Sequence, residues 1–424
     1  MIEIMMNNKI FFICNTTLHL DVIKRILEEE HFQKRFSSYV IFFNPTGSNT
    51  VLKEYFYKLN ISNVKTAEIS LFNDNKSFLS LNIFKRWFYV TIAKRQIKKL
   101  ILTYKPFLCV LQNDIDLINR TVIKFCRIYN VRTMLIVESP LLPYIKGRNL
   151  IGKIKFYIGK IIESIGFYEY GTNMYGCGST DVICVPGIQS KILLEKLGVN
   201  NEKIFITGQP RYIGILNMKE QLSFENKFDN LIISFFTTNI YSGMRDEKGH
   251  IAQIKDITDL YNLLENLIYN RFQLWVKIHP SDRLDFYNDL KKYKNLVIYQ
   301  GSSDSYDIMK KSEILFINFS TSYVEALLIG VPCVIYANAL VRIKSKYYDY
   351  KGLIHTIPLK RKIFSIKELE KFLKNFLEYE KLKFEIKQEQ NILLKKLVKL
   401  DVNPIVEIIH IIESIWKKYN KCIE

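Results

Sequence analysis

Several residue types that interrupt or cross-link a chain are scarce in this sequence. Only 17 of 424 residues are glycine and 10 are proline, which excludes fibrous and low-complexity architectures. The seven cysteines are scattered and form no Cys-x-x-Cys pair, so we expect reduced, mostly buried thiols and no zinc cage. The sequence has no run of about eighteen apolar residues and no signal-peptide pattern. These absences predict a cytoplasmic protein with reduced cysteines.

Acidic residues are also in deficit. The sequence has 61 Lys and Arg against 42 Asp and Glu, a formal charge of +19. Such an excess favours polyanionic partners: nucleic acid, anionic lipid or an acidic polymer. An AT-rich genome favours lysine codons and accounts for part of the total. Nucleic-acid binding stays a remote alternative, because no RNA-binding signature, zinc module or basic helix with aromatic platforms supports it.

The positive charge is concentrated in two segments that also carry aromatic residues, 84–105 and 144–170. The first has Trp87 and Phe88 followed by a basic cluster, namely Lys94, Arg95, Lys98 and Lys99. Helices of this composition lie in membrane interfaces. We therefore predict peripheral association with the inner face of the plasma membrane, with an acidic glycan as the alternative partner.

Strand and helix patterns alternate along most of the chain. Apolar runs such as "KIFFIC", "FLCVL" and "LIISFF" have the composition of strands buried on both faces, and helical patterns separate them. This alternation predicts parallel α/β sheets covered by helices. We expect an acceptor-side domain at 1–215, a nucleotide-binding domain at 216–365 and C-terminal helices at 366–424 that pack back on both.

Polar residues recur where the apolar strands end. Because ligands of open α/β sheets bind at the carboxyl ends of the strands, we expect these residues to share one interdomain cleft. They are Asn15, Asn113, Asp114, Glu138, Gln209, Arg211, His279 and Ser320 to Ser322.

A hydroxyl-rich turn follows the strand "ILFIN". Ser320, Thr321 and Ser322 lead into a helical segment that ends at Gly330. Hydroxyls at a helix N-terminus, where amide donors are free, predict an anion site. Glu325, three residues after Ser322, is a further candidate for binding the donor, and a capping box alone is the alternative interpretation.

The segment "KIHP" ends another apolar strand. Pro280 favours an extended backbone at His279, and Lys277 lies two residues earlier on the same side. A histidine and a lysine beside a hydroxyl-lined helix terminus are suited to a phosphate leaving group. Gly208 and Arg211, in "TGQPR", are further candidates for binding the donor, with an interdomain salt bridge as the alternative for Arg211.

Carboxylates at the strand ends of the first half are candidate bases. Glu138 in "VESP" is the first choice for activating an acceptor hydroxyl, and a surface or ion-paired glutamate is the alternative. Asp114 and Asp116 are competing bases or hydroxyl binders. Asn15 and Asn113, with Asp114, are the expected acceptor contacts.

Together, "KIHP", the Ser-Thr-Ser segment, the opening "IFFICNTTLHLDVI" and two α/β halves resemble the GT-B glycosyltransferases. Among them, bacterial sialyltransferases and capsular polysialyltransferases are the most similar. The resemblance implies two Rossmann-like domains facing an interdomain cleft, with His279, Pro280 and Ser320–Ser322 binding the cytidine monophosphate of CMP-sialic acid. It also implies an acidic base in the N-terminal domain, which is Glu138 here, although "VESP" lacks the acidic pair followed by glycine of the polysialyltransferases.

These features predict an inverting transfer of a nonulosonic acid from a CMP-sugar to a glycan hydroxyl, in capsule or lipooligosaccharide synthesis. The partners are then a nucleotide-sugar donor and a glycan acceptor, with no cofactor. We expect no metal, because the nearest Asp-x-Asp match, "DID" at 114–116, lies in the acceptor half. The motifs are shared with CDP-glycerol and Kdo transferases, so those donors, a UDP-sugar transferase and a UDP-sugar epimerase stay open. A non-catalytic membrane scaffold is the last alternative.

Overall fold

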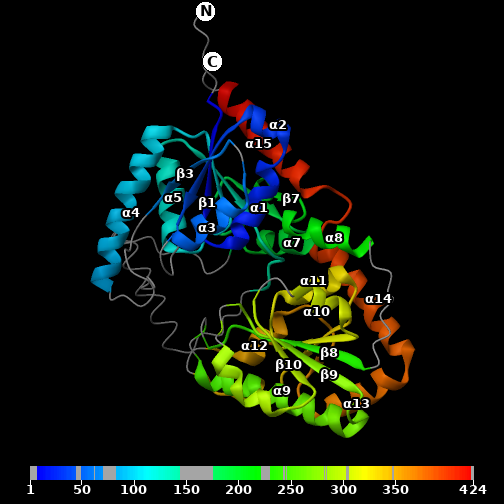
Figure 1. Ribbon diagram of the computed structural model, residues 1–424. Helices are drawn as coiled ribbons and strands as arrows, with labels where there is room; N and C mark the ends of the chain where they lie inside the picture. The colour runs from blue at the N-terminus through cyan, green and yellow to red at the C-terminus, as the bar shows by residue number, and fades with distance from the viewer. Residues whose placement is uncertain are drawn as a thin grey trace, which may run out of the picture. The chain divides into compact units, whose positions relative to one another are not determined.

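The computed structural model describes most of the chain, in two compact units (Figure 1). The described residues are 7–43, 49–61, 63–69, 83–143, 175–220, 230–241, 244, 246–280, 282, 284–301, 305–345 and 348–421. Unit 1 comprises three stretches of described residues. They are the residues up to Leu141, those from 175 to Arg211, and those from Val398 onward. Unit 2 runs from Tyr212 to Leu397, together with Leu142 and Pro143.

Unit 1 is built on a seven-stranded sheet in the order β3-β2-β1-β4-β5-β6-β7. All neighbouring strands pair in parallel, so their carboxyl ends lie at one edge. The strands are β1 (Lys9–Cys14), β2 (Ser37–Phe42), β3 (Lys65–Glu68), β4 (Leu108–Leu111), β5 (Arg132–Ile136), β6 (Val182–Val185) and β7 (Ile204–Ile206).

Helices cover both faces of this sheet. They are α1 (Thr17–Leu27), α2 (Glu30–Arg35), α3 (Thr50–Lys58), α4 (Ile83–Tyr104), α5 (Leu117–Ile128), α7 (Ile188–Lys196) and α15 (Pro404–Lys421), with the 3-10 turns η2 (Asn201–Lys203) and η3 (Pro210–Tyr212). On β1, Phe11 and Ile13 pack with α4 and α5 in one cluster. Phe12, on the opposite face, contacts Phe32 of α2. This alternation explains why the strand is apolar throughout.

The last helix, α15, returns to unit 1. Trp416 packs edge-on against Phe36, and its indole N–H donates to the carbonyl of Asn7. Pro404 occupies the first helical position, where a missing amide hydrogen has no consequence.

Unit 2 repeats the design with a six-stranded parallel sheet in the order β10-β9-β8-β11-β12-β13. The strands are β8 (Leu231–Phe236), β9 (Phe272–Lys277), β10 (Leu296–Tyr299), β11 (Ile314–Ile317), β12 (Cys333–Tyr336) and β13 (Lys362–Ile363). The helices are α8 (Ile213–Glu220), α9 (Glu247–Ile268), α10 (Ser305–Lys311), α11 (Ser322–Ile329), α12 (Tyr350–Thr356), α13 (Ile366–Glu378) and α14 (Glu380–Leu397), with the 3-10 segments η4 (Leu284–Lys292) and η5 (Leu340–Arg342). One core cluster joins the sheet to α9, α13 and η4.

The predicted architecture of two parallel α/β sheets with helices at the C-terminus is confirmed. The units divide between Arg211 and Tyr212, whereas the sequence placed the junction at 215. Of the C-terminal helices, α13 and α14 belong to unit 2 and α15 to unit 1. The basic segment 84–105 folds as α4, and the second basic segment, 144–170, lies outside the described residues. No helix in the described ranges combines the length and the apolar character needed to cross a bilayer.

Candidate active site

Two acid–base side chains meet at the carboxyl edge of the unit 1 sheet. Glu138 follows β5, and His19 lies in the first turns of α1, after β1. The Nε2 atom of His19 is 3.0 Å from Oε1 of Glu138. The His19 side chain is 4% exposed and that of Glu138 is 26% exposed, so the carboxylate is the member of the pair that a ligand can reach.

The surroundings of His19 fix its proton. The backbone amide of Asn15 donates to Nδ1 of His19 at 3.1 Å, so Nδ1 is an acceptor and the ring proton lies on Nε2, facing Glu138. The backbone of His19 is held as well: its amide donates to the Thr16 hydroxyl, which caps α1. The amide nitrogen of the Gln112 side chain donates to the His19 carbonyl. The imidazole therefore has one orientation and one tautomer.

Glu138 is fixed through the residue before it. The side-chain nitrogen of Gln209, which follows β7, donates to the carbonyl of Val137 at 2.7 Å. Oε1 of Glu138 is buried beside His19 and has no hydrogen-bond partner among the described residues, although the side chain is partly exposed, which leaves Oε2 as the oxygen available to a substrate. This geometry is suited to accepting a proton from a hydroxyl.

The predicted acceptor residues form the support of this edge. The Asn15 side chain donates to Asp116 at 3.1 Å, and Asp116 caps α5 by accepting from the amides of Ile118 and Asn119. Burial raises the pKa of Asp116, and the amide donors oppose that shift. The Asn113 side-chain oxygen accepts from the amide of Ile115 in a local turn.

Asp114 does not reach the surface. Its carboxylate is fully buried and accepts the amides of Gly176 and Gly178 at 2.8 to 3.1 Å. Burial raises the pKa of Asp114 to about 6, against the effect of these donors. A Cβ atom at Gly178 would lie 2.5 Å from Oδ2 of Asp114, so this approach requires glycine. In the structure Asp114 anchors this loop, and its contact with an acceptor stays a prediction.

Tyr175 directly precedes Gly176, one of the two glycines that bind Asp114. Burial, with the nearby charges of Glu138, Asp116 and Asp114, raises the pKa of Tyr175 to about 12. Its hydroxyl is protonated at neutral pH, as in any tyrosine, and is a potential hydrogen-bond donor near these carboxylates. Sequence reasoning missed both Tyr175 and His19. The only local signal for His19 was its place just after a strand, and Tyr175 had none.

In unit 2, the "KIHP" segment follows β9 as predicted. The amide of His279 donates to the Thr237 hydroxyl at 2.9 Å, and the His279 carbonyl accepts from the amide of Asp282. The Tyr287 hydroxyl donates to Asp282 at 3.0 Å and lies 3.3 Å from the Thr237 hydroxyl, and these contacts fix the turn. Pro280, in the same turn, is exposed.

His279 is half-buried, and this environment sets its charge. Burial, together with the charge of Lys277, lowers the pKa of His279, and Asp282 opposes the shift. The imidazole is thus mostly neutral at pH 7. A neutral imidazole can still donate a hydrogen bond to a phosphate, and the contact expected from the sequence stays a prediction.

Lys277 is 3% exposed, and its ammonium donates to the carbonyls of Gly301 and Ile278. Lys277 therefore ties the end of β9 to the loop after β10. Its positive charge still acts on His279 next to it.

The Ser-Thr-Ser segment follows β11 at the carboxyl edge of the unit 2 sheet. α11 starts at Ser322, and Thr321, the N-cap, makes no side-chain capping bond. The Ser320 and Ser322 hydroxyls lie 2.9 Å apart, and the Ser322 amide donates to the Ser320 hydroxyl. The alternative interpretation of Ser322 and Glu325 as a capping box is therefore wrong. A capping box requires Ser322 at the N-cap, and Ser322 is the first residue inside the helix. Glu325 is 7% exposed, whereas the Ser-Thr-Ser hydroxyls border solvent.

A buried carboxylate supports this edge. Asp256 of α9 accepts from the amides of Ala339 and Leu340, which follow β12, and from the Asn318 side chain, which follows β11. Burial raises the pKa of Asp256 to about 7, and the charge of Asp259 contributes. The ends of β11 and β12 are thereby fixed together.

Gly208 and Arg211, the other predicted donor residues, follow β7 in unit 1. Gly208 has a φ of +77°, and a Cβ there would lie 2.9 Å from Pro404 Cγ at the start of α15. Its contacts are thus those of helix packing. Arg211 is half-buried in η3, and its amide donates to the side-chain oxygen of Gln209. Arg211 thus lies next to Gln209 in this turn. Gln209 is the residue whose side chain holds the carbonyl of Val137, directly before Glu138.

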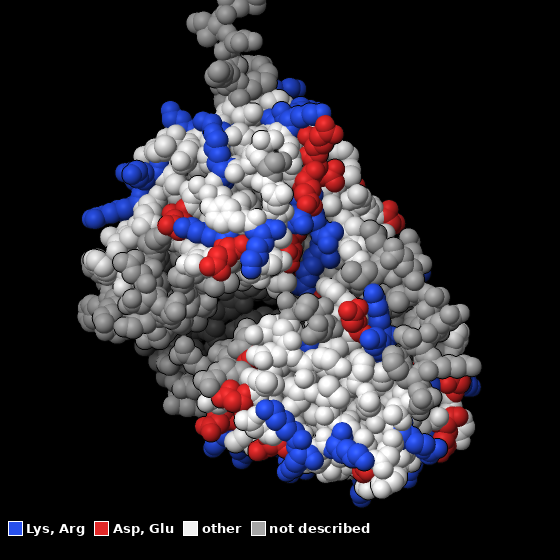
Figure 2. Space-filling model, viewed as in Figure 1, with Lys and Arg blue, Asp and Glu red and all other residues white. Residues whose placement is uncertain are grey.

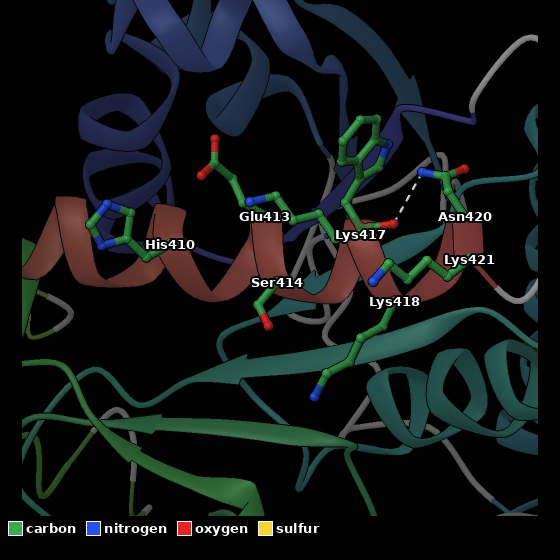
Figure 3. Close-up of a pocket in the computed structure, with 8 residues that line it drawn as sticks. His410, Glu413, Ser414, Lys417, Lys418, Asn420 and Lys421 are labelled. Carbon is green, nitrogen blue, oxygen red and sulfur yellow. Dashed lines mark hydrogen bonds between the residues drawn. The ribbon is translucent and has the colours of Figure 1, made fainter.

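Two cavities lie elsewhere in unit 1. One, of about 640 Å³, runs along α15, and its lining side chains leave the helix on different sides, as Glu413 and Ser414 show (Figure 3). The carboxylate of Glu413 already binds His31 and Arg35 at 2.9 and 2.7 Å. The other, of about 720 Å³, lies between α5, α15 and the first residues of β5 and β6, at the amino edge of the sheet. In the described part of the chain, no three His, Cys, Asp or Glu side chains are grouped as metal ligands.

The structure is similar to solved proteins, although no family model and no curated protein matches the sequence. The UDP-GlcNAc 2-epimerase of Neisseria meningitidis, bound to UDP-GlcNAc, is 13% identical, with a TM-score of 0.59 over 96% of this chain and 100% of that one. The UDP-GlcNAc 2-epimerase of Methanocaldococcus jannaschii, in complex with UDP-GlcNAc and UDP, is 16% identical, with a TM-score of 0.59 over 96% and 99%. A UDP-glucosyltransferase of Polygonum tinctorium is 11% identical, with a TM-score of 0.55 over 97% and 99%. At these identities the likeness establishes the fold, which is GT-B.

Proposed function

We propose that this protein is a nucleotide-sugar-dependent glycosyltransferase in which Glu138 is the general base. The observation that carries the proposal is the contact of Glu138 with His19. A buried imidazole with its proton on Nε2 lies 3.0 Å from one carboxylate oxygen, and the other oxygen stays accessible. A glutamate with only a structural role would not need an accessible oxygen. Here Oε2 is accessible, although His19 beside it is held in one orientation.

The proposed step is a single displacement. Oε2 of Glu138 takes the proton of an acceptor hydroxyl as its oxygen attacks the anomeric carbon. The bond from that carbon to the donor phosphate breaks, and the nucleotide leaves with the electron pair. The configuration at the anomeric carbon is therefore inverted.

Unit 2 is assigned the nucleotide. The neutral imidazole of His279, the Ser320 and Ser322 hydroxyls and the first amides of α11 are hydrogen-bond donors suited to a phosphate. Asp256 and Asn318 fix the strand ends that carry these donors. In this proposal, His279 stabilises the charge that grows on the leaving phosphate.

The donor we propose first is a UDP-sugar, because the solved proteins of similar fold are named for UDP-sugars. A CMP-activated nonulosonic acid is the second candidate, and the observation in its favour is the "KIHP" segment with the Ser-Thr-Ser turn. Epimerisation of a UDP-sugar is the competing reaction, since the same names include epimerases.

One assay separates these reactions. The protein is incubated with UDP-GlcNAc, UDP-glucose, CMP-sialic acid, CMP-Kdo and CDP-glycerol, with and without a panel of glycan acceptors, and free nucleotide and sugar products are measured. Acceptor-dependent release of UDP supports a UDP-sugar transferase, and release of CMP supports the second donor. An altered sugar still attached to UDP identifies an epimerase and rejects the transferase proposal, as does turnover that Glu138→Gln leaves unchanged.

A further inference from the structure

Helix α4 of unit 1 has an unusual composition for a helix on the surface of a protein. Its 22 residues, IFKRWFYVTIAKRQIKKLILTY, include six Lys or Arg and no Asp or Glu. Surface helices ordinarily mix both signs, because oppositely charged pairs three or four residues apart stabilise the helix. The proposed reaction gives this helix no role.

One face of α4 is firmly packed. Val90, Ala93, Ile97 and Ile101 are at most 3% exposed, and the last three belong to the core cluster of unit 1. Near the C-terminal end, the Tyr104 ring packs against Phe11 of β1 and Tyr39 of β2. The helix is therefore held rigidly, with a fixed face toward solvent.

The solvent face carries apolar and basic side chains together. Phe88 is 57% exposed and Leu102 is 45% exposed. Arg95 and Lys99, both exposed, fall on the same stripe at helical spacing. The stripe spans about 21 Å at 1.5 Å per residue. Figure 2 shows basic side chains standing out over this helix.

The basic side chains of this face form no ion pair with the described residues of unit 1. Among the described residues, no carboxylate lies within 4.0 Å of Lys94, Arg95, Lys98 or Lys99 in any ion pair of the structure. Helix α14 of unit 2 provides the contrast. It exposes Phe384 as well, but its lysines alternate with glutamates, and Lys383 pairs with Glu380 at 2.7 Å.

We propose that the solvent face of α4 docks on an anionic phospholipid bilayer. Four basic groups that form no ion pair among the described residues attract anionic headgroups, and Phe88 and Leu102, near the two ends of the stripe, enter the interfacial region. A soluble acidic glycan would satisfy the charges, but it would leave the two exposed apolar side chains without a favourable environment. The apolar residues therefore favour the lipid surface.

The test uses the full chain and two sets of vesicles, pure phosphatidylcholine and phosphatidylcholine mixed with phosphatidylglycerol. We expect co-sedimentation with the mixed vesicles only, falling steeply as salt rises. Each basic residue at an anionic surface strengthens binding about fivefold, so replacing Lys94, Arg95, Lys98 and Lys99 by Gln weakens it on the order of several hundredfold. Phe88→Ser with Leu102→Ser weakens vesicle binding while the charge is unchanged.

A matched variant controls for net charge. Lys367, Lys381, Lys395 and Lys396 are exposed lysines of α13 and α14, and replacing them by Gln removes the same charge from unit 2. This variant should bind vesicles like the wild type, and thermal melts should show all variants folded. Equal loss in the control, or no binding to mixed vesicles at low salt, overturns the proposal. If Phe88→Ser with Leu102→Ser binds normally, the face recognises an acidic polymer and the lipid proposal is wrong.

Discussion

The imidazole of His19 lies behind the carboxylate of Glu138, with Nε2 3.0 Å from Oε1. Histidine is the more deeply buried member of the pair, so the pair presents a carboxylate to the solvent and keeps the imidazole inside. This order gives the two residues different roles. In the proposed reaction, Glu138 takes the proton and His19 is a positioning residue beside it.

Glu138→Gln should abolish turnover and leave nucleotide binding intact. The amide is the same size as the carboxylate but does not accept a proton, and general base catalysis contributes roughly 10²- to 10⁴-fold. The measurement is the rate of nucleotide release, alongside the nucleotide-induced rise in Tm. Glu195→Gln, an exposed change on α7, is the control and should be neutral. If Glu138→Gln loses nucleotide affinity in proportion to rate, Glu138 has a structural role.

The two substitutions of His19 should differ. Gln can present an amide N–H near the position of Nε2, whereas Leu removes the donor and leaves the amide of Asn15 without its acceptor. We expect kcat to fall more for His19→Leu than for His19→Gln, with KM for the donor unchanged in both. The exposed His410→Gln on α15 serves as the control. Equal kcat values for the Leu and Gln variants would contradict the positioning role.

His279→Ala should lower kcat by roughly 10²- to 10³-fold, the range for losing one preorganised donor to a developing charge. Ser322→Ala should weaken nucleotide binding by only about 1 kcal/mol, because the amides of α11 remain. Isothermal titration with nucleotide and initial rates separate the two effects. His355→Ala, an exposed histidine of α12, is the matched control. Wild-type kinetics in the His279 variant would exclude it from the reaction.

The sequence predicted the strand ends well and the contacts across them poorly. Runs buried on both faces, such as 9–14 and 231–236, identify parallel strands, and the polar residues after them lie at the carboxyl edges as expected. His19 and Glu138 are 119 positions apart, and no local pattern encodes a contact over that distance. Their meeting depends on the sheet order, in which β4 separates β1 from β5.

Predictions from local sequence patterns also failed for side chains that can bond to more than one neighbour. Alternation correctly placed Lys277 near His279, but its long side chain reaches the carbonyl of Gly301, in the loop after the neighbouring strand β10. The Ser-x-x-Glu pattern placed the cap at Ser322, one residue later than the N-cap at Thr321. Helix boundaries shift by a residue or two because cap and first-turn positions accept the same residue types.

Gly178→Ala should destabilise unit 1 through a steric clash. The new Cβ would lie 2.5 Å from a carboxylate oxygen of Asp114 and 2.8 Å from its carbonyl, both in the buried loop anchor. Gly198→Ala is the comparison: φ is +85° there, but no atom lies within 4 Å of the new Cβ. Strain alone costs roughly 1 kcal/mol at such a position, so Gly178→Ala should lose more stability in urea denaturation. Equal losses would mean that the loop moves without cost.

The buried carboxylate of Asp256 should make stability fall as pH rises. Burial raises the pKa of Asp256 to about 7, well above the value of an unfolded aspartate. Between about pH 4 and 7 the unfolded chain has released this proton and the folded chain retains it, so each pH unit removes up to about 1.4 kcal/mol of stability. Below the unfolded pKa the contribution is complete, and above pH 7 it is lost.

Asp256→Asn should remove this slope. Asn keeps one acceptor oxygen where Asp256 accepts the amides of Ala339 and Leu340 and the Asn318 side chain, so the variant starts less stable. Its stability should nevertheless change less between pH 5 and 8 than that of the wild type, because it has no proton to release. Subtracting the two denaturation series at each pH isolates Asp256 from His279, whose lowered pKa acts in the opposite direction near pH 6. Parallel curves for the two proteins would show that Asp256 is ionised throughout this range and that burial does not control its proton.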